Sequence, residues 1–168
     1  GMQKIGEKIY IFSEQGILQH GPTAFNGYFY YCGEDGSVYF GDQDRTPVTI
    51  GSDSYLINPK GHILCGWQLV NSKRYWYSPK TGTLTFGWLT DYLGGTYYSD
   101  RENGKYTGDM VIDSHVYRFE SSGRLCTGQQ GFDLGDGITA YYYFYKDGSY
   151  AVNQFITENG STYYFYSN

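Results

Sequence analysis

Aromatic and apolar positions recur along the chain at a nearly constant spacing. A glycine follows six or seven residues after each of the first seven tyrosines that open an aromatic cluster, and an apolar or aromatic residue stands two positions further on, as in Gly16 and Leu18. Successive opening tyrosines are 20, 25, 20, 22, 20, 25 and 21 residues apart: Tyr10, Tyr30, Tyr55, Tyr75, Tyr97, Tyr117, Tyr142 and Tyr163. Self-similarity at such a period is the signature of a repeat protein.

Each repeat predicts a β-hairpin. The tyrosine segment is expected to form the first strand and the glycine-led segment the second, joined by polar turns such as 13–16 and 58–61. A single hairpin is barely stable in water, but stacked hairpins bury a shared core. We therefore expect an all-β solenoid of about seven to eight stacked β-hairpin repeats of 20–25 residues, forming one array over 1–168. The extra residues at 42–49 and 129–140 should form loops or bends.

Composition agrees with this architecture and excludes several others. Aromatic residues make up 20% of the chain and glycine contributes 24 residues, which favours strands and turns over helices. A helical bundle is excluded, and a doubly wound α/β enzyme is disfavoured. The net charge of −5, with no basic cluster, argues against nucleic acid as a partner. No apolar stretch is long enough to span a bilayer, so we expect no membrane insertion. Gly1 ahead of Met2 looks like the remnant of an added tag, so a missing signal peptide says nothing against secretion.

No pattern in the chain indicates catalysis, a cofactor or a metal site. The histidines His20, His62 and His115 occupy different repeat positions, and no catalytic triad order, metal-ligand spacing or phosphate loop is present. Three cysteines without C-x-x-C spacing do not indicate a disulfide framework, and Cys32 is interpreted as small apolar filler. The acidic inserts at 42–44 and 133–136 are interpreted as solvated turns, with calcium binding as the alternative.

Both faces of the tyrosine-led strands carry large side chains. Residues two apart share a face, and the residue between them is also large and apolar in every repeat except the one with Arg118: Ile11, Tyr31, Leu56, Trp76, Tyr98, Tyr143 and Tyr164. One face can fill the core. The other must pack on the next hairpin or present rings to a ligand, because aromatic faces stack on sugars and attract quaternary ammonium groups. Most of these rings are expected to be core.

The tryptophans carry a resemblance to a known family. Trp67 and Trp88 follow repeat-boundary glycines, and Trp76 lies between them in an aromatic triplet. This arrangement over 66–90 resembles the choline-binding, or cell-wall-binding, repeat of Gram-positive surface proteins. The segment 159–165 is more similar to the related glucan-binding repeats and clostridial toxin receptor-binding repeats.

The resemblance implies a ligand held between adjacent hairpins by the boundary tryptophan, a triplet ring of the same repeat and a triplet ring of the next. It assigns one box to Trp67, Tyr75 and Tyr97. It assigns a second to Trp88, Tyr97 and Tyr117, with Trp76 and Tyr98 as neighbours. The other boundaries lack the tryptophan, so at most two boxes are expected; the residues there are Pro22, Asp42, Asp109, Gln129 and Gln154.

These features predict a non-catalytic binding module at the extracellular bacterial cell surface, within a larger surface protein. Its expected partner is the choline of cell-wall teichoic acid, or a polysaccharide. The alternative is a structural or adhesive rod that binds a host or bacterial protein. Open sheet edges at the ends of the array would also allow end-to-end self-association.

Overall fold

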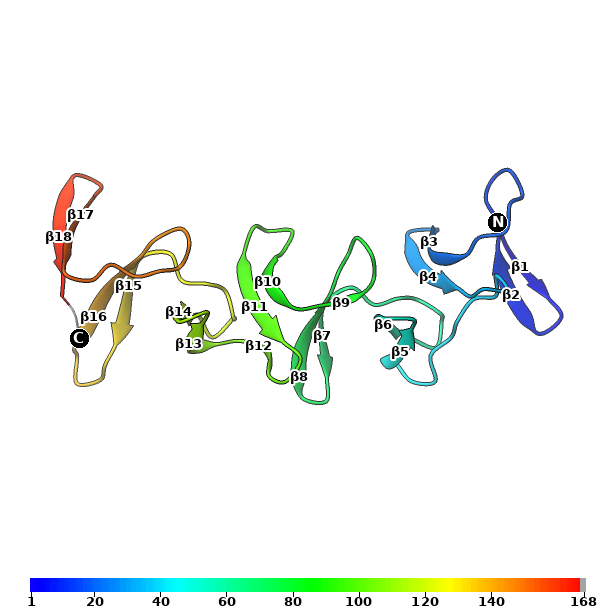
Figure 1. Ribbon diagram of the computed structural model, residues 1–168, viewed down its shortest axis with the longest axis horizontal. Helices are drawn as coiled ribbons and strands as arrows, with labels where there is room; N and C mark the ends of the chain where they lie inside the picture. The colour runs from blue at the N-terminus through cyan, green and yellow to red at the C-terminus, as the bar shows by residue number, and fades with distance from the viewer. Residues whose placement is uncertain (167–168) are drawn as a thin grey trace. The chain divides into compact units, whose positions relative to one another are not determined.

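A computed structural model describes residues 1–166, and these residues contain strands and turns but no α-helix (Figure 1). The first nine strands are β1 (Met2–Ile5), β2 (Lys8–Ile11), β3 (Gly21–Phe25), β4 (Tyr28–Cys32), β5 (Thr46–Ile50), β6 (Asp53–Ile57), β7 (Gly66–Val70), β8 (Lys73–Tyr77) and β9 (Leu84–Thr85). The remaining strands are β10 (Gly87–Thr90), β11 (Thr96–Asp100), β12 (Gly104–Lys105), β13 (Gly108–Ile112), β14 (His115–Phe119), β15 (Gly128–Asp133), β16 (Thr139–Phe144), β17 (Gln154–Glu158) and β18 (Ser161–Phe165). Over this range no membrane-spanning helix is found.

The strands form small separate sheets. Six sheets are two-stranded hairpins of consecutive strands, and β7-β8-β9 and β10-β11-β12 have three strands each. The expected all-β class with repeated hairpins is confirmed. The chain forms two compact units. The first contains Gly1–Gly87 and Asp100–Gly104, and the second contains Trp88–Ser99 and the chain from Lys105 onward. Each unit is described by itself below.

The main strand pairing within a repeat differs from the pairing predicted. Strand β4 forms its full ladder with β3, the strand before it, from the pair Gly21 and Cys32 onward. The glycine-led segment pairs with β4 through a single bridge, between Cys32 and Val38. The turn explains the choice: Asn26 and Gly27 both have positive φ, at 48° and 78°. Positive φ at both central residues gives a turn whose twist matches that of the flanking strands. The Asn-Gly pair was the sequence signal for this hairpin.

Backbone hydrogen bonds join successive hairpins inside each unit. In the first unit, the Ile63 N–H donates to the Phe29 carbonyl at 2.7 Å. In the second, the Leu125 N–H donates to the Thr96 carbonyl, also at 2.7 Å. The donors are the apolar residues that follow the turn glycines, and their side chains lie in the core: Ile63 packs with Tyr55, and Leu125 packs in another cluster. The repeated apolar position therefore links neighbouring hairpins through both backbone and side chain.

The buried core is divided into small clusters, one after another. Two of the three cysteines are fully buried, and Cys32 packs with Ile11, Tyr30 and Val38. Burial raises the pKa of the Cys32 and Cys126 thiols. The interpretation of Cys32 as apolar filler agrees with its position.

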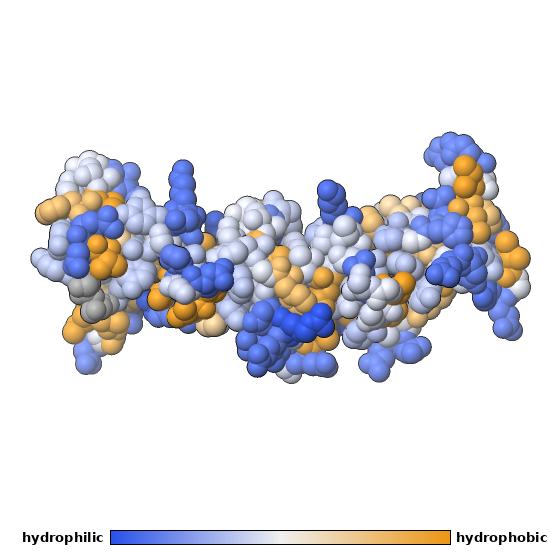
Figure 2. All heavy atoms as spheres, in the orientation of Figure 1, coloured by the Kyte–Doolittle hydropathy of each residue, from blue (hydrophilic) through white to orange (hydrophobic). Residues whose placement is uncertain are grey.

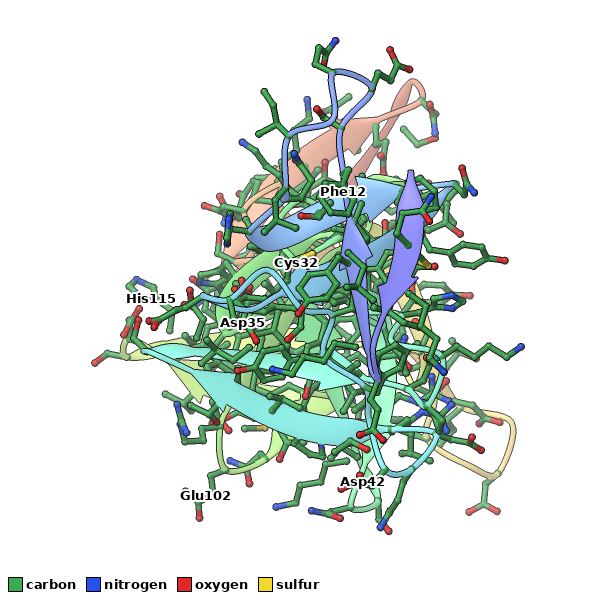
Figure 3. All side chains as sticks on the ribbon, turned by 90° about the vertical axis from the view of Figure 1, so that its right-hand side faces the viewer. Phe12, Cys32, Asp35, Asp42, Glu102 and His115 are labelled. Carbon is green, nitrogen blue, oxygen red and sulfur yellow. The ribbon has the colours of Figure 1, made fainter. Side chains whose placement is uncertain are left out.

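The two inserts are accommodated in different ways. Residues 42–45 form an exposed loop ahead of β5, and Asp42 lies at the periphery of the view in Figure 3. The second insert instead lengthens the hairpin β15–β16 to six residue pairs, from Gly128 and Phe144 to Asp133 and Thr139. Among residues 1–166, no group of three or more acidic, histidine or cysteine side chains is placed to hold a metal ion.

Candidate ligand-binding site

Cross-strand register decides which side chains share one face of each hairpin. In several hairpins the residue after the boundary glycine pairs with the middle residue of the aromatic triplet. This pair is Trp67 with Trp76 in β7–β8, and Asp109 with Arg118 in β13–β14. Residues directly opposite each other on neighbouring strands lie close enough for their side chains to interact. The identity of this one pair therefore sets the chemistry of that face.

In the first compact unit, the pair consists of two indoles in contact. The rings of Trp67 and Trp76 meet edge to face, with centroids 5.3 Å apart. Trp76 is buried and Trp67 is half-buried. Tyr75 points to the opposite face of β8, where its hydroxyl donates to the Arg101 carbonyl at 3.2 Å. Trp76 therefore serves the core of this unit, whereas part of Trp67 remains accessible.

The second compact unit presents an exposed tryptophan among other rings. Trp88, on β10, is 42% exposed. Its ring meets Tyr98 and Tyr117 edge to face, with centroid distances of 5.1 and 4.8 Å. The buried ring of Phe119 lies 6.1 Å away and supports the group from the core. We call Trp88, Tyr98, Tyr117 and Phe119 the Trp88 cluster.

Contact between these rings leaves part of the indole accessible. Centroids about 5 Å apart belong to rings in direct contact. An aromatic face attracts a cation that lies within about 6 Å of the ring centroid. The Trp88 ring is 42% exposed, and we call its exposed part the Trp88 platform.

The structure brings together three of the residues predicted from the sequence: Trp88, Tyr98 and Tyr117. Tyr97 points to the opposite face of β11 from Tyr98, and its hydroxyl donates to Asp91 Oδ2 at 2.9 Å. Burial and then this hydrogen bond raise the pKa of the Tyr97 phenol. Tyr98 thus contacts Trp88 in the place expected for Tyr97. That any of these rings contacts a ligand stays a prediction.

The other predicted box draws on both compact units. Trp67 and Tyr75 belong to the first unit, together with their neighbour Trp76, and Tyr97 belongs to the second. This box also stays a prediction.

A cationic side chain held by rings was missed from the sequence. The guanidinium of Arg118 lies 3.9 Å from the ring centroid of Phe132 and 5.8 Å from that of Tyr142. Its Nε is 3.0 Å from Asp109 Oδ1. A cavity of about 140 Å³ lies alongside, and its lining includes Asp109, Tyr117, Arg118 and Tyr142. The sequence contained a signal for this site, because Arg118 is the one charged residue at the middle position of a triplet.

Tyrosines also line a groove near the C-terminal end of the described chain. The groove has a volume of about 560 Å³, and Gln129 contributes a polar side chain to it. Its tyrosines come from two neighbouring hairpins and the residue after them: Tyr141, Tyr142, Tyr163, Tyr164 and Tyr166. Several of these rings are exposed. Figure 2 shows hydrophobic residues reaching the surface among hydrophilic ones. The density of tyrosine in 141–145 and 163–166 was the sequence signal.

The chain is similar to known repeat-containing proteins. No protein-family model matches the sequence. Glucosyltransferase-I of Streptococcus downei is 27% identical over 142 residues, which cover 83% of this chain and 8% of that protein. Choline binding protein F of Streptococcus pneumoniae superposes with a TM-score of 0.61 at 21% identity, over 98% of this chain and 55% of the other. A structure of CbpF in complex with ipratropium is 28% identical, with a TM-score of 0.52, over 91% of this chain and 60% of the other.

The resemblance to choline-binding and glucan-binding repeats is confirmed. The chain spans less than two thirds of the length of each of these relatives. The described residues thus contain three candidate sites: the Trp88 cluster, the Arg118 site and the C-terminal tyrosine groove.

Proposed function

We propose that this chain is a non-catalytic binding module of a larger protein on the bacterial cell surface, and that it holds choline-bearing wall polymer or carbohydrate on exposed aromatic side chains. The observation that carries the proposal is the Trp88 cluster, in which Tyr98 and Tyr117 hold a 42% exposed indole. The fold shared with choline binding protein F and the sequence similarity to a streptococcal glucosyltransferase support it. The hydrogen bonds between successive hairpins support stacking of the repeats as a solenoid.

The chemistry of the platform suits both ligand classes. The face of an indole attracts a quaternary ammonium group by roughly 0.5–2 kcal/mol, depending on how far the contact is desolvated. The same face can stack on the C–H face of a sugar ring. A single contact of this strength binds weakly. A polymer with many identical groups binds more tightly, because the second contact occurs at the high effective concentration set by the first.

The C-terminal tyrosine groove supports the carbohydrate branch of the proposal. Its rings offer stacking surfaces over two hairpins, and the Gln129 amide offers both a donor and an acceptor. An extended saccharide fits such a groove better than a small cation does, because the rings are spread along it.

The test is a calorimetric titration of the chain with choline, then with teichoic acid and with α-glucan. Replacing Trp88 with Ala should weaken binding of the responding ligand roughly 3- to 30-fold, the loss expected for one ring contact. Tyr92→Ala is the matched control, because Tyr92 is 89% exposed in the turn that follows the same strand. It should bind as the unaltered chain does.

The responses to the three ligands distinguish a choline-binding module from a carbohydrate-binding one. A saturable response to choline assigns the module to choline-bearing polymer, and a response to glucan alone assigns it to carbohydrate. Silence with all three ligands would contradict the proposal and favour the structural or adhesive rod.

A further inference from the structure

One hairpin carries a salt bridge where another carries two tryptophans. Asp109 and Arg118 form a cross-strand pair in β13–β14, at the position that Trp67 and Trp76 occupy in β7–β8. The Arg118 Nε lies 3.0 Å from Asp109 Oδ1. The side chain of Arg118 is 30% exposed, so most of it lies within the protein.

The surroundings of Arg118 are those of a site for an organic cation. Its guanidinium lies 3.9 Å from the Phe132 ring and 5.8 Å from the Tyr142 ring. Both distances fall within the range in which a ring attracts a cation. These two rings come from β15 and β16, the next hairpin, whereas Asp109 comes from the same hairpin as Arg118. Two aromatic faces and a carboxylate thus converge on one positive charge.

The space around the guanidinium is already hollow. A cavity of about 140 Å³ lies beside Arg118, lined also by Asp109, Tyr117, Tyr142 and Phe144. Shortening Arg118 to its Cβ would enlarge this cavity and leave the carboxylate and the rings in place. The emptied site would keep an uncompensated negative charge and apolar walls, the combination that favours a quaternary ammonium ion over a metal ion.

We propose that Arg118 is a built-in cation that occupies an aromatic and acidic site between two hairpins and keeps external organic cations out of it. Arg118 therefore determines specificity at this hairpin: the position holds its own positive charge and takes no ligand. The site contains no tryptophan; it shares Tyr117 with the Trp88 cluster, so the experiment below tests the two sites separately.

The experiment measures binding of tetramethylammonium, with sodium at equal ionic strength as reference. In the unaltered chain this position should contribute no site. Arg118→Ala should gain one saturable site and bind the ion at least tenfold more tightly than the unaltered chain does. Tetramethylammonium should also raise the melting temperature of this variant by more than it raises that of the unaltered chain. Arg118→Lys is the matched control, because it retains a cation and should gain nothing.

Further variants keep the result interpretable. Arg118→Thr leaves the same opening with a side chain that suits a strand, in case alanine weakens β14. Adding Asp109→Asn to Arg118→Ala should reduce the gained affinity, because the carboxylate loses its charge. Adding Trp88→Ala should leave the gain intact, which separates this site from the proposed platform.

Two results would contradict the proposal that Arg118 keeps organic cations out of the site. If the folded alanine and threonine variants gain no tetramethylammonium site, Arg118 only ties the two hairpins together and the proposal is wrong. A gain in Arg118→Lys equal to that in Arg118→Ala would also overturn it, because occupancy by a cation would then not matter.

Discussion

Asp109 pairs with Arg118 across β13 and β14, in the same register position in which two indoles meet across β7 and β8. The backbone places each pair in the same way, and only the side chains differ. In one hairpin the indoles of Trp67 and Trp76 pack on each other. In the other, a salt bridge extends to the ring of Phe132 on the next hairpin. The same hairpin register therefore supports different side-chain chemistry in different repeats.

The turn glycine Gly148 is a point where one repeat packs closely on the preceding one. A Cβ at Gly148 would lie 2.8 Å from both methyl carbons of Leu125, and the residue has a φ of +85°. Gly148→Ala should therefore lower the free energy of unfolding by about 2–4 kcal/mol, from overpacking and backbone strain together. Urea unfolding followed by circular dichroism measures the change.

The control for this substitution is Gly137→Ala. Gly137 has a similar φ of +75°, but a Cβ there meets no atom within 4 Å among the described residues. It should lose only the strain contribution, about 1–2 kcal/mol. Equal losses in the two variants would show that contact with Leu125 adds nothing.

Ser99 places a hydroxyl in the core of the second unit. It is fully buried on β11, and among residues 1–166 its Oγ has no hydrogen-bond partner. A buried hydroxyl left unbonded is costly, so Ser99→Ala should raise the free energy of unfolding by about 1 kcal/mol. Chemical denaturation is the measurement. Ser149→Ala is the contrasting control, because the Ser149 hydroxyl donates to Asp147 Oδ1 at 2.6 Å. It should be destabilising, and a loss of stability in Ser99→Ala would contradict the prediction.

Asp91 organises the turn between β10, which carries Trp88, and β11. Its carboxylate accepts hydrogen bonds from the Gly95 N–H at 2.8 Å and the Tyr97 hydroxyl at 2.9 Å, and also from the Leu93 N–H. Burial acts to raise the pKa of Asp91, but the hydrogen bonds outweigh it and lower the pKa. Asp91→Asn should therefore lower the free energy of unfolding at pH 7 by about 1 kcal/mol.

The pH dependence of this effect follows from linkage. Because the pKa of Asp91 is lower in the folded chain, the unfolded chain binds more protons as the pH falls below about 4. The stabilisation is complete above that pH and is lost as the pH drops through the folded pKa. The difference between the unaltered chain and Asp91→Asn should shrink in acid. Asp44→Asn, in the exposed loop at 42–45, should match the unaltered chain throughout. If the unaltered chain and Asp91→Asn still differ in stability at pH 2, the ionised carboxylate of Asp91 is not the cause of the difference.

The sequence predicted the repeat and its strand content well, but not the partner of each strand. Tyr30 and Gly36 are found at their expected positions in a strand and a turn, because both signals are local. The pairing of β4 with β3 depended on the Asn26-Gly27 turn, whose two positive φ values match the strand twist. The sequence prediction used the spacing of tyrosines and turn glycines and did not consider the Asn26-Gly27 turn.

The residues of the candidate site were likewise predicted from the sequence only in part. Trp88 and Tyr117 could be named together from the sequence because the resemblance to choline-binding repeats implies a box made of a boundary tryptophan and triplet rings. Strand alternation puts Tyr97 and Tyr98 on opposite faces of β11. Which of the two rings faces Trp88 is known only from the structure, in which Tyr98 contacts it.

The sequence by itself determined the period, the all-β class and the aromatic character of both strand faces, since these depend on spacing along the chain. Only the tertiary structure decided that the Trp88 ring contacts Tyr98 and Tyr117 and stays 42% exposed. It alone brought Arg118 to Phe132 and Tyr142 of the next hairpin. Contacts between hairpins depend on register, twist and the way an insert such as 129–140 is accommodated, and these are properties of the packed chain.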